Sequence, residues 1–343
     1  MPPAIHTVPL RPPEAAAPGK SGPVIDNDGD PMAAAPAGAL ILRADALDMG
    51  VNADDIKRRL ERGHWVSVRP GAYLRAATDA ALTPRQRHLL QINATMAAGG
   101  EHLVVSHRSA ACLHGFDLLT IPGRIVDVTN GEAAAGRRTR LRHTYCAPLE
   151  PDEIVVLGSH RVTSPARTLV DLARSGSFEE ALVATDHALH HQRVSRDELR
   201  ASMDRAPRRK GMRSARQVVV FADGRVESAG ESRSRLLIAR QLLPVPDLQV
   251  AIRTRNGVVV AHSDFGWPQY RTVGEFDGFE KYSRSLRPGE SVGDRIHAEK
   301  IREDLIRELG WNVVRWTWSE LDEPEALARI RRALVRGGLR VGA

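Results

Sequence analysis

Acidic side chains collect in a short stretch near the C-terminal end of the chain. Asp264, Glu275 and Asp277 lie close together in the sequence, and Lys281 follows them. The apolar residues that precede Asp264 and Glu275 are typical of paired strands. Residues two apart in a strand point to the same side, so we expect Glu275 and Asp277 to face one way. A hairpin partner would bring Asp264 alongside them.

Clustered carboxylates repel one another unless a cation lies between them. Oxygen ligands of this kind suit Mg²⁺ or Mn²⁺, and a bound divalent ion can activate water for attack on a phosphodiester. The pattern therefore indicates a metal-dependent phosphodiesterase site. The alternative interpretation is a site that does not cut, in which the acids only cap the ends of strands.

The composition favours an acidic partner. The 343 residues carry a formal net charge of +7 and the isoelectric point is about 9.9, as in many proteins that bind DNA. A genome that encodes arginine and alanine freely would give the same excess. Cys112 and Cys146 lack the spacing of zinc ligands or of a disulfide framework, so we expect a cytoplasmic protein. No apolar run approaches the ~20 residues that cross a membrane, and no membrane partner is expected.

The N-terminal part divides into a leader and a small domain. Residues 1–37 are rich in Pro, Ala and Gly and are predicted to be a disordered leader, unless the start codon is assigned too early. Residues 38–80 predict a short helix, then a basic helix capped by Asn52 and ended by Gly63, then a hairpin. This order is typical of a winged helix-turn-helix.

The basic side chains of this domain are the candidate DNA contacts. A recognition helix enters the major groove, and the wing touches the phosphate backbone. The alternative is a small helical module whose arginine side chains are only solvated. The candidate residues are Lys57, Arg58, Arg59, Arg62 and Arg69.

The middle of the chain, residues 81–206, alternates predicted helices and short strands in an α/β pattern. His107 and His114 have no carboxylate near them in the sequence, so we interpret them as structural. Arg167 and Asp171 are four apart and are predicted to pair on one helix face. The basic segment 207–225 is predicted to be a linker or helix that contacts phosphates or joins two domains.

The last unit, residues 226–337, predicts a helix, three antiparallel strands, a helix, another strand and a final helix. Such an α/β core is large enough to fold alone. We therefore predict an α/β multidomain protein with an N-terminal winged helix-turn-helix, an α/β middle region and a C-terminal α/β domain.

The motifs of the last unit resemble those of the very-short-patch-repair-like endonucleases of the PD-(D/E)XK superfamily. The first unit looks like the winged-helix domain of AbiEi-type antitoxins, which are DNA-binding autorepressors. The middle unit resembles the region that follows that domain. The segments that carry the endonuclease resemblance are 230–234, 264–268, 274–278, 299–304, 310–311 and 315–318. The segments that mark the middle unit are 106–111 and 163–168.

The endonuclease resemblance implies a restriction-endonuclease-like fold and a set of roles. Asp264 and Glu275 match the two carboxylates of the superfamily and would bind Mg²⁺ or Mn²⁺. Asp277 stands where the family has lysine, and would add a ligand or orient a water. Lys281, or else Lys300, would supply the amine that stabilises the charge on the scissile phosphate. The helix carboxylate of the family matches Glu231, with Glu227 as the alternative.

Three hypotheses follow from these patterns. The first is a DNA-binding, metal-dependent nuclease that acts in a defence or toxin–antitoxin system. The second is a transcriptional repressor or antitoxin-like regulator whose nuclease fold does not cut. The third is an interaction module that acts on a cognate toxin protein.

Overall fold

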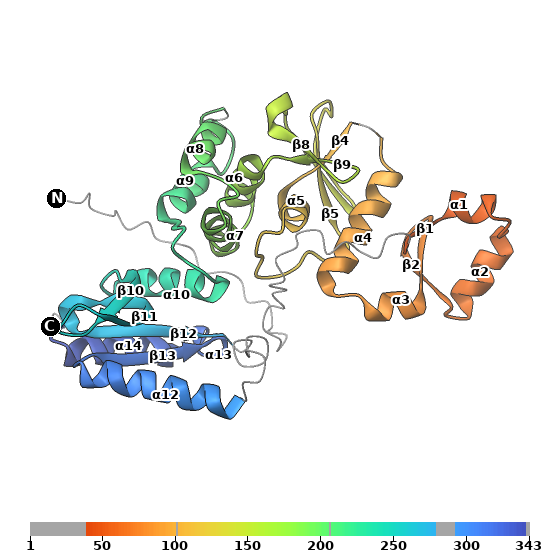
Figure 1. The fold of residues 1–343 in the computed structure, drawn as a ribbon. Helices are drawn as coiled ribbons and strands as arrows, with labels where there is room; N and C mark the ends of the chain where they lie inside the picture. The colour runs from red at the N-terminus through yellow and green to blue at the C-terminus, as the bar shows by residue number, and fades with distance from the viewer. Residues whose placement is uncertain (1–38, 101, 206, 279–291, 341–343) are drawn as a thin grey trace.

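The computed structural model describes residues 39–100, 102–205, 207–278 and 292–340. The predicted leader and Lys281 lie outside these residues. Within them the chain forms three successive units, each built around its own sheet, as Figure 1 shows from red through green to blue. The protein is therefore a mixed α/β multidomain protein, as the sequence predicts.

The first unit is a small three-stranded sheet flanked by short helices. The Asn52 side chain accepts a hydrogen bond from the Asp55 backbone N–H at 2.8 Å, so the predicted cap begins α2. The strands are antiparallel in the order β1-β3-β2. The elements are β1 (Ile41–Leu42), α1 (Arg43–Asp48), α2 (Ala53–Glu61), β2 (Trp65–Arg69), β3 (Ala72–Arg75) and α3 (Ala76–Ala81).

The middle unit has a six-stranded mixed sheet, in the order β6-β7-β5-β4-β9-β8, covered by helices. Thr83 begins α4 with a capping box to Gln86, as the Thr-Pro pair predicts. The elements are α4 (Pro84–Ala97), β4 (Leu103–Val105), α5 (His107–Leu113), β5 (Val126–Asn130), β6 (Arg137–Arg138), β7 (Arg142–Cys146), β8 (Ile154–Leu157), β9 (His160–Thr163), α6 (Pro165–Ser175), α7 (Phe178–His190), α8 (Arg196–Asp204) and α9 (Met212–Phe221).

Helix α9 lies inside the segment that the sequence suggested as a linker. Met212, Ala215 and Val218 are buried in the same apolar core as α5 and α6. Gly211 precedes the helix with φ +83°, and a Cβ there would lie 1.9 Å from the Arg174 carbonyl oxygen. Only glycine fits this close approach. The basic segment is therefore folded onto the middle unit.

The third unit is a four-stranded sheet, β10-β11-β12-β13, with helices on both faces. The first three strands are antiparallel, as predicted, and β13 is parallel to β12. The elements are α10 (Ala229–Arg240), β10 (Asp247–Arg253), β11 (Val259–Trp267), β12 (Thr272–Asp277), α12 (Val292–Glu308), β13 (Asn312–Thr317), α13 (Trp318–Leu321) and α14 (Pro324–Arg336).

An apolar layer covers each face of this sheet. Phe276 and Trp316 pack with α10 and α14 on one face, and Val273 packs with Ile306 of α12 on the other. Alternate residues of β12 point to opposite faces. Glu275 therefore shares the α12 face with Val273, and this side of the sheet holds the candidate site.

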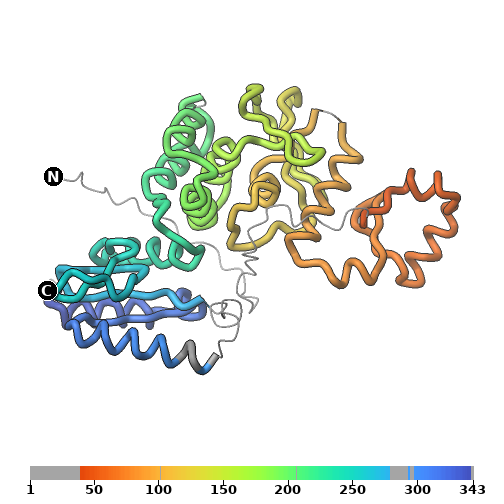
Figure 2. The backbone as a smooth tube through the Cα atoms, in the orientation of Figure 1, coloured from red at the N-terminus to blue at the C-terminus, as the bar shows by residue number. Residues whose placement is uncertain are grey.

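The middle and C-terminal units contact each other through α7 and α10. Figure 2 shows the chain in these two segments close together in space. The Arg233 Nε atom lies 2.6 Å from Glu179 Oε1, and the Ser232 hydroxyl donates to Asp186 Oδ2 at 2.8 Å. Leu182 and Leu236 share a buried cluster between the two helices. Polar and apolar contacts thus join these two units.

Candidate functional site

Carboxylates from a strand and a helix meet on the α12 face of the C-terminal sheet. Oxygen atoms of Glu275, Asp277 and Glu299 lie within 4.8 Å of one another. The two strand residues face the same way, as the period of two predicts. Glu299 comes from α12, which crosses this face. The sequence did not assign it a role, because nothing local indicates that α12 would lie over β12.

Arg315 of β13 lies among these acids. The parallel pairing of β12 with β13 sets Arg315 directly beside Glu275. Its Nη2 atom is 2.9 Å from Glu275 Oε2, and its Nη1 atom is 3.6 Å from Asp277 Oδ2 and 2.6 Å from Glu299 Oε1. Its Nε atom is 3.2 Å from Glu303 Oε2. One guanidinium group therefore contacts four carboxylates.

A second arginine completes the neutralisation of Glu275. Arg302 Nη2 lies 2.7 Å from Glu275 Oε1, and the Glu275 residue is only 5% exposed. Burial raises the pKa of Glu275, although the charges of Arg302 and Arg315 oppose the shift. Burial acts to lower the pKa of Arg315, but the surrounding carboxylates, Glu275 first, outweigh it and hold that pKa above its usual value. Arg315 stays charged within this cluster.

Asp264 and Glu231 do not belong to this close group of three, although the charge of Asp264 acts on both Glu275 and Glu231. Asp264 Oδ2 accepts a hydrogen bond from the Phe276 backbone N–H at 2.8 Å, at the end of the β11–β12 pairing. Glu231 is buried at the start of α10, where it accepts from the Glu227 backbone N–H and the Ser228 hydroxyl. Among the described residues, Glu299 rather than the predicted Asp264 completes the close set with Glu275 and Asp277.

The pKa of Glu231 makes a testable contribution to stability. Burial, and then the charge of Asp264, raise this pKa to about 7. A carboxyl group whose pKa is raised by folding stabilises the fold at low pH, and that stability is lost as pH rises towards the folded pKa. We expect the wild-type protein to lose about 3 kcal/mol between about pH 4 and pH 7 through this group, and Glu231→Gln to remove that loss.

Urea unfolding across this pH range measures the effect, with the exposed Glu308→Gln as the control. The free energy of unfolding of the control should depend on pH as that of the wild type does. A Glu231→Gln profile that is as steep as the wild-type profile would contradict the assignment.

The donor atoms at this site suit a divalent cation, but their present partners do not leave room for one. Carboxylate oxygens are the ligands that Mg²⁺ and Mn²⁺ prefer. The Arg315 nitrogens already contact all three side chains that could coordinate the ion. In this arrangement the residues do not fit a metal ion, and Lys281, the proposed amine, is outside the described residues.

The candidate DNA contacts fall into two groups in the structure. Lys57, Arg58, Arg59 and Arg62 are exposed on α2 or at its end, although Arg58 pairs with Asp55. The Arg59 guanidinium also lies 4.9 Å from the centre of the Trp65 ring. Lys57 pairs with Glu61 at 3.8 Å. We call these four exposed basic side chains the α2 basic face.

Arg69 differs from the other four candidates. It is only partly exposed and donates a hydrogen bond to the Thr95 hydroxyl of α4. Burial, followed by repulsion from Arg142, lowers its pKa. The predicted wing residue thus links the first unit to the middle unit.

The middle unit contains a buried charge network that the sequence revealed only in part. Arg167 Nε lies 2.8 Å from Asp171 Oδ2, which confirms the predicted pair, and Arg167 Nη1 lies 2.9 Å from Glu153 Oε2. Arg174 also contacts Asp171, at 2.7 Å. Asp171, which is distant in the sequence, acts electrostatically on buried His107.

His107 is nevertheless placed as a structural residue. It stacks on Tyr145 with ring centres 3.5 Å apart, and its Nδ1 atom lies 2.9 Å from the Ser106 hydroxyl. Burial lowers its pKa to about 4, so it is neutral at pH 7. His114 lies 2.7 Å from the Thr163 carbonyl oxygen, which fits the structural interpretation of both histidines.

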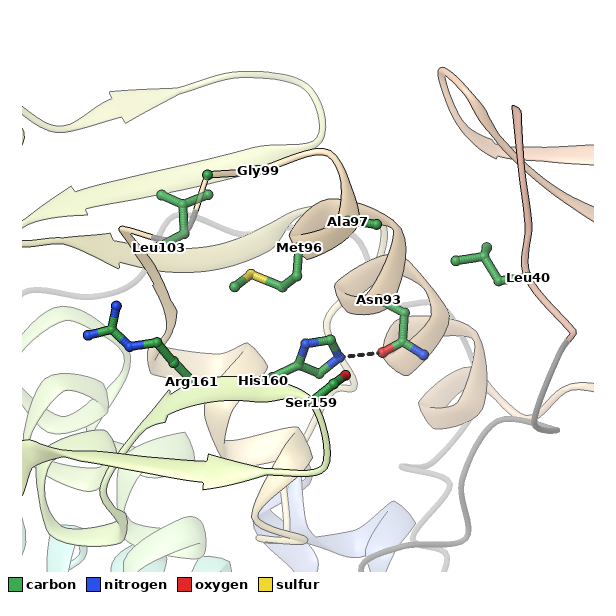
Figure 3. Close-up of a pocket in the computed structure, with 10 residues that line it drawn as sticks. Leu40, Asn93, Met96, Ala97, Gly99, Leu103, Ser159, His160 and Arg161 are labelled. Atoms are coloured by element: carbon green, nitrogen blue, oxygen red, sulfur yellow. Dashed lines mark hydrogen bonds between the residues drawn. The ribbon is translucent and has the colours of Figure 1, made fainter. Parts of the chain in front are cut away.

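A groove of about 690 Å³ opens on the middle unit beside α4. Figure 3 shows it between the end of α4 and the turn that joins β8 to β9. His160 Nε2 lies 2.7 Å from Asn93 Oδ1 at its base, and Leu40 of the first unit borders it. No feature of the sequence predicted this groove, because its walls come from three distant segments.

Comparison with known proteins identifies the class of the middle unit. Residues 103–219 match the family model of the AbiEi antitoxin C-terminal domain. The match confirms the resemblance predicted for this part of the chain and indicates a toxin–antitoxin context. No helix within the described residues is long and apolar enough to span a membrane.

Two similar relatives come from Mycobacterium tuberculosis. They are the uncharacterized proteins MT2308 of strain CDC 1551 / Oshkosh and Rv2248 of strain ATCC 25618 / H37Rv. Each is 32% identical to this chain, and the alignment covers 69% of this chain and 83% of the relative. The chain therefore belongs to the family of these mycobacterial proteins.

A solved structure shows a weaker similarity. The crystal structure of the RV2827C protein from Mycobacterium tuberculosis aligns with a TM-score of 0.38 and 14% sequence identity. The alignment covers 58% of this chain and 76% of that chain. This similarity is too low to support an argument about fold or function.

Proposed function

We propose that the protein is a DNA-binding regulator of the AbiEi antitoxin type, with a cognate toxin as its protein partner. The observation that carries the proposal is the α2 basic face, on a helix–turn–helix–hairpin unit that precedes an AbiEi antitoxin domain. The side chains of this face are exposed, and Lys57 and Arg58 can exchange their ion pairs with nearby acids for contacts with phosphates. The hairpin β2–β3 follows α2 directly, in the position of a wing.

The test is a titration of the full chain with duplex DNA at several salt concentrations. One duplex carries the region upstream of the protein's own gene, and the other has a scrambled sequence of equal length. Phosphate contacts release counterions, so the logarithm of the association constant should fall linearly with the logarithm of salt concentration. Absence of binding to both duplexes would overturn the proposal.

A second candidate function is metal-dependent cleavage of a phosphodiester, with Mg²⁺ or Mn²⁺ as the cofactor. The observation that favours it is the close approach of Glu275, Asp277 and Glu299 at one end of the sheet. Asp264 and Glu231 would act from the rim of the site. Lys281 would supply the amine.

Plasmid incubated with the protein and Mn²⁺ tests this second function. The second function predicts nicking by the wild-type protein and at least about a hundredfold slower nicking by Glu275→Ala, because a metal ligand is lost. If Arg315 keeps the ion out, neither protein nicks the plasmid. Glu308→Ala is the control, since that exposed residue lies away from the cluster. Equal nicking by Glu275→Ala and the control would overturn the catalytic assignment.

A further inference from the structure

The two outer strands of the middle sheet differ in how they are protected. The sheet ends at β6 on one side and at β8 on the other. β6 consists of two exposed arginines, Arg137 and Arg138, whereas β8 has the sequence Ile-Val-Val-Leu. Proteins normally block an edge strand with charges, proline or a bulge, because its open N–H and C=O groups can pair with another chain. β8 carries no charge or proline, and its register with β9 is unbroken.

Both faces of β8 are apolar. Val155 and Leu157 pack against the core of the middle unit. Successive side chains of a strand alternate between its faces, so Ile154 and Val156 point to the opposite side, where Val156 is 70% exposed. The solvated face of an antiparallel pair is normally polar. An apolar outer face on an unblocked edge strand favours pairing with a further strand.

The backbone along the outer edge of β8 is open to such pairing. In an antiparallel pair, alternate residues direct their N–H and C=O groups towards the neighbouring strand. The Ser164 N–H donates to the Glu153 carbonyl oxygen, which places Glu153 and Val155 among the residues that bond towards β9. Ile154 and Val156 therefore direct theirs away from β9. Within the described residues, no backbone–backbone hydrogen bond from outside the β8–β9 pair reaches either residue.

The two ends of β8 carry opposite charges. Glu150 and Asp152 are exposed just before the strand, although Asp152 also pairs with Arg205. Arg161 is exposed just after the turn that follows the strand. A two-fold axis at Val155 would set two copies of β8 side by side in opposite directions. The acidic end of each strand would then lie beside the basic end of the other, and opposite charges on paired strands attract.

We propose that the outer edge of β8 is the docking surface for a second copy of this chain. The two β8 strands pair antiparallel across the two-fold axis and join the two middle sheets into one. The backbone of Ile154 bonds to Val156 of the partner subunit, and the exposed Val156 side chain packs beside Ile154 of the partner subunit. This contact is independent of DNA binding and of the acid cluster in the C-terminal unit.

Sedimentation velocity of the full chain over a range of concentrations tests this contact. Pairing of two short strands gives a small interface, so we expect a monomer–dimer equilibrium with a dissociation constant on the order of 10 µM. Val156→Lys places a charge at the centre of the pairing and should weaken the dimer at least about tenfold. The matched control is Val220→Lys, which should associate as the wild type does, because Val220 is 81% exposed on α9, away from β8.

Two results of this experiment would overturn the contact. One is a wild-type chain that stays monomeric at concentrations on the order of 100 µM. The other is equal association of the wild type, Val156→Lys and Val220→Lys.

An exchange of charges tests the two-fold arrangement. Glu150→Arg alone and Arg161→Glu alone each place like charges beside each other across the axis, so each should weaken the dimer several-fold. The chain that carries both substitutions should recover the association of the wild type, because opposite charges face each other again. A double variant that associates no better than the single variants would reject the antiparallel pairing.

Amide hydrogen exchange of the wild type keeps the test valid if Val156→Lys folds poorly. Hydrogen bonds across the axis would protect the amides of Ile154 and Val156 only in the dimer. Their exchange should therefore slow as the protein concentration rises through the dissociation constant, whereas the Val155 amide, which bonds towards β9, should change less. Exchange of Ile154 and Val156 that does not depend on concentration would contradict docking at β8.

Discussion

Replacement of Arg167 by alanine is expected to lower the free energy of unfolding by about 3–5 kcal/mol. Arg167 is 1% exposed and contacts Asp171 and Glu153, which are 0% and 4% exposed. In the variant Asp171 keeps Arg174, whereas Glu153 keeps, among the described residues, the hydrogen bond from the Glu150 backbone N–H. A buried carboxylate without a cation is costly because burial removes it from water.

Urea unfolding at neutral pH measures this loss, and Arg200→Ala is the matched control. Arg200 also pairs with an acid on a helix, but that pair is exposed to solvent. Exposed pairs contribute little, so the control should unfold with the wild-type midpoint. Similar midpoints for Arg167→Ala and Arg200→Ala would show that the buried network does not stabilise the middle unit.

Local signals in the sequence determine where several helices begin. Asn52 and Thr83 accept hydrogen bonds from backbone N–H groups three residues later, as their types and spacing indicate. Ser164 does the same for α6. Each cap depends only on residues within one turn, so the sequence contains all the information that it needs.

The candidate site depended on contacts that the sequence does not encode locally. Glu275 and Asp277 share a face because a strand has a period of two, and this part was predictable. Glu299 and Arg315 join them only because α12 crosses the sheet and β13 pairs in parallel with β12. A parallel neighbour needs a crossover connection, and its register cannot be derived from a local turn. The partner that neutralises the acids was therefore missed.

The role of the basic segment before the C-terminal unit stayed open for a related reason. Arginines near Arg213 suggested either a linker or a helix, and the structure shows a helix whose residues Met212, Ala215 and Val218 are buried. Whether such a helix is a linker or part of a core depends on the groove that receives it. Here α6 and α7 provide that groove.

Reversal of the charge at two positions of the α2 basic face should weaken DNA binding on the order of a hundredfold and reduce the salt slope by about two. The variant carries Arg58→Glu and Arg59→Glu. Both side chains are exposed, and the helix cap at Asn52 is retained. Each substitution replaces an attraction to phosphate with a repulsion. Charge reversal therefore lowers the binding energy more than neutral substitutions at the same two positions would.

The matched control is Arg213→Glu with Arg216→Glu, which makes the same change in net charge at two exposed positions of α9. If α2 docks on DNA, the control should bind almost as tightly as the wild type. Equal losses in the two double variants would indicate that overall charge, rather than α2, determines the affinity. Unchanged binding in the α2 variant would remove this helix as the contact surface, because the remaining exposed basic groups would then account for all of the phosphate contacts.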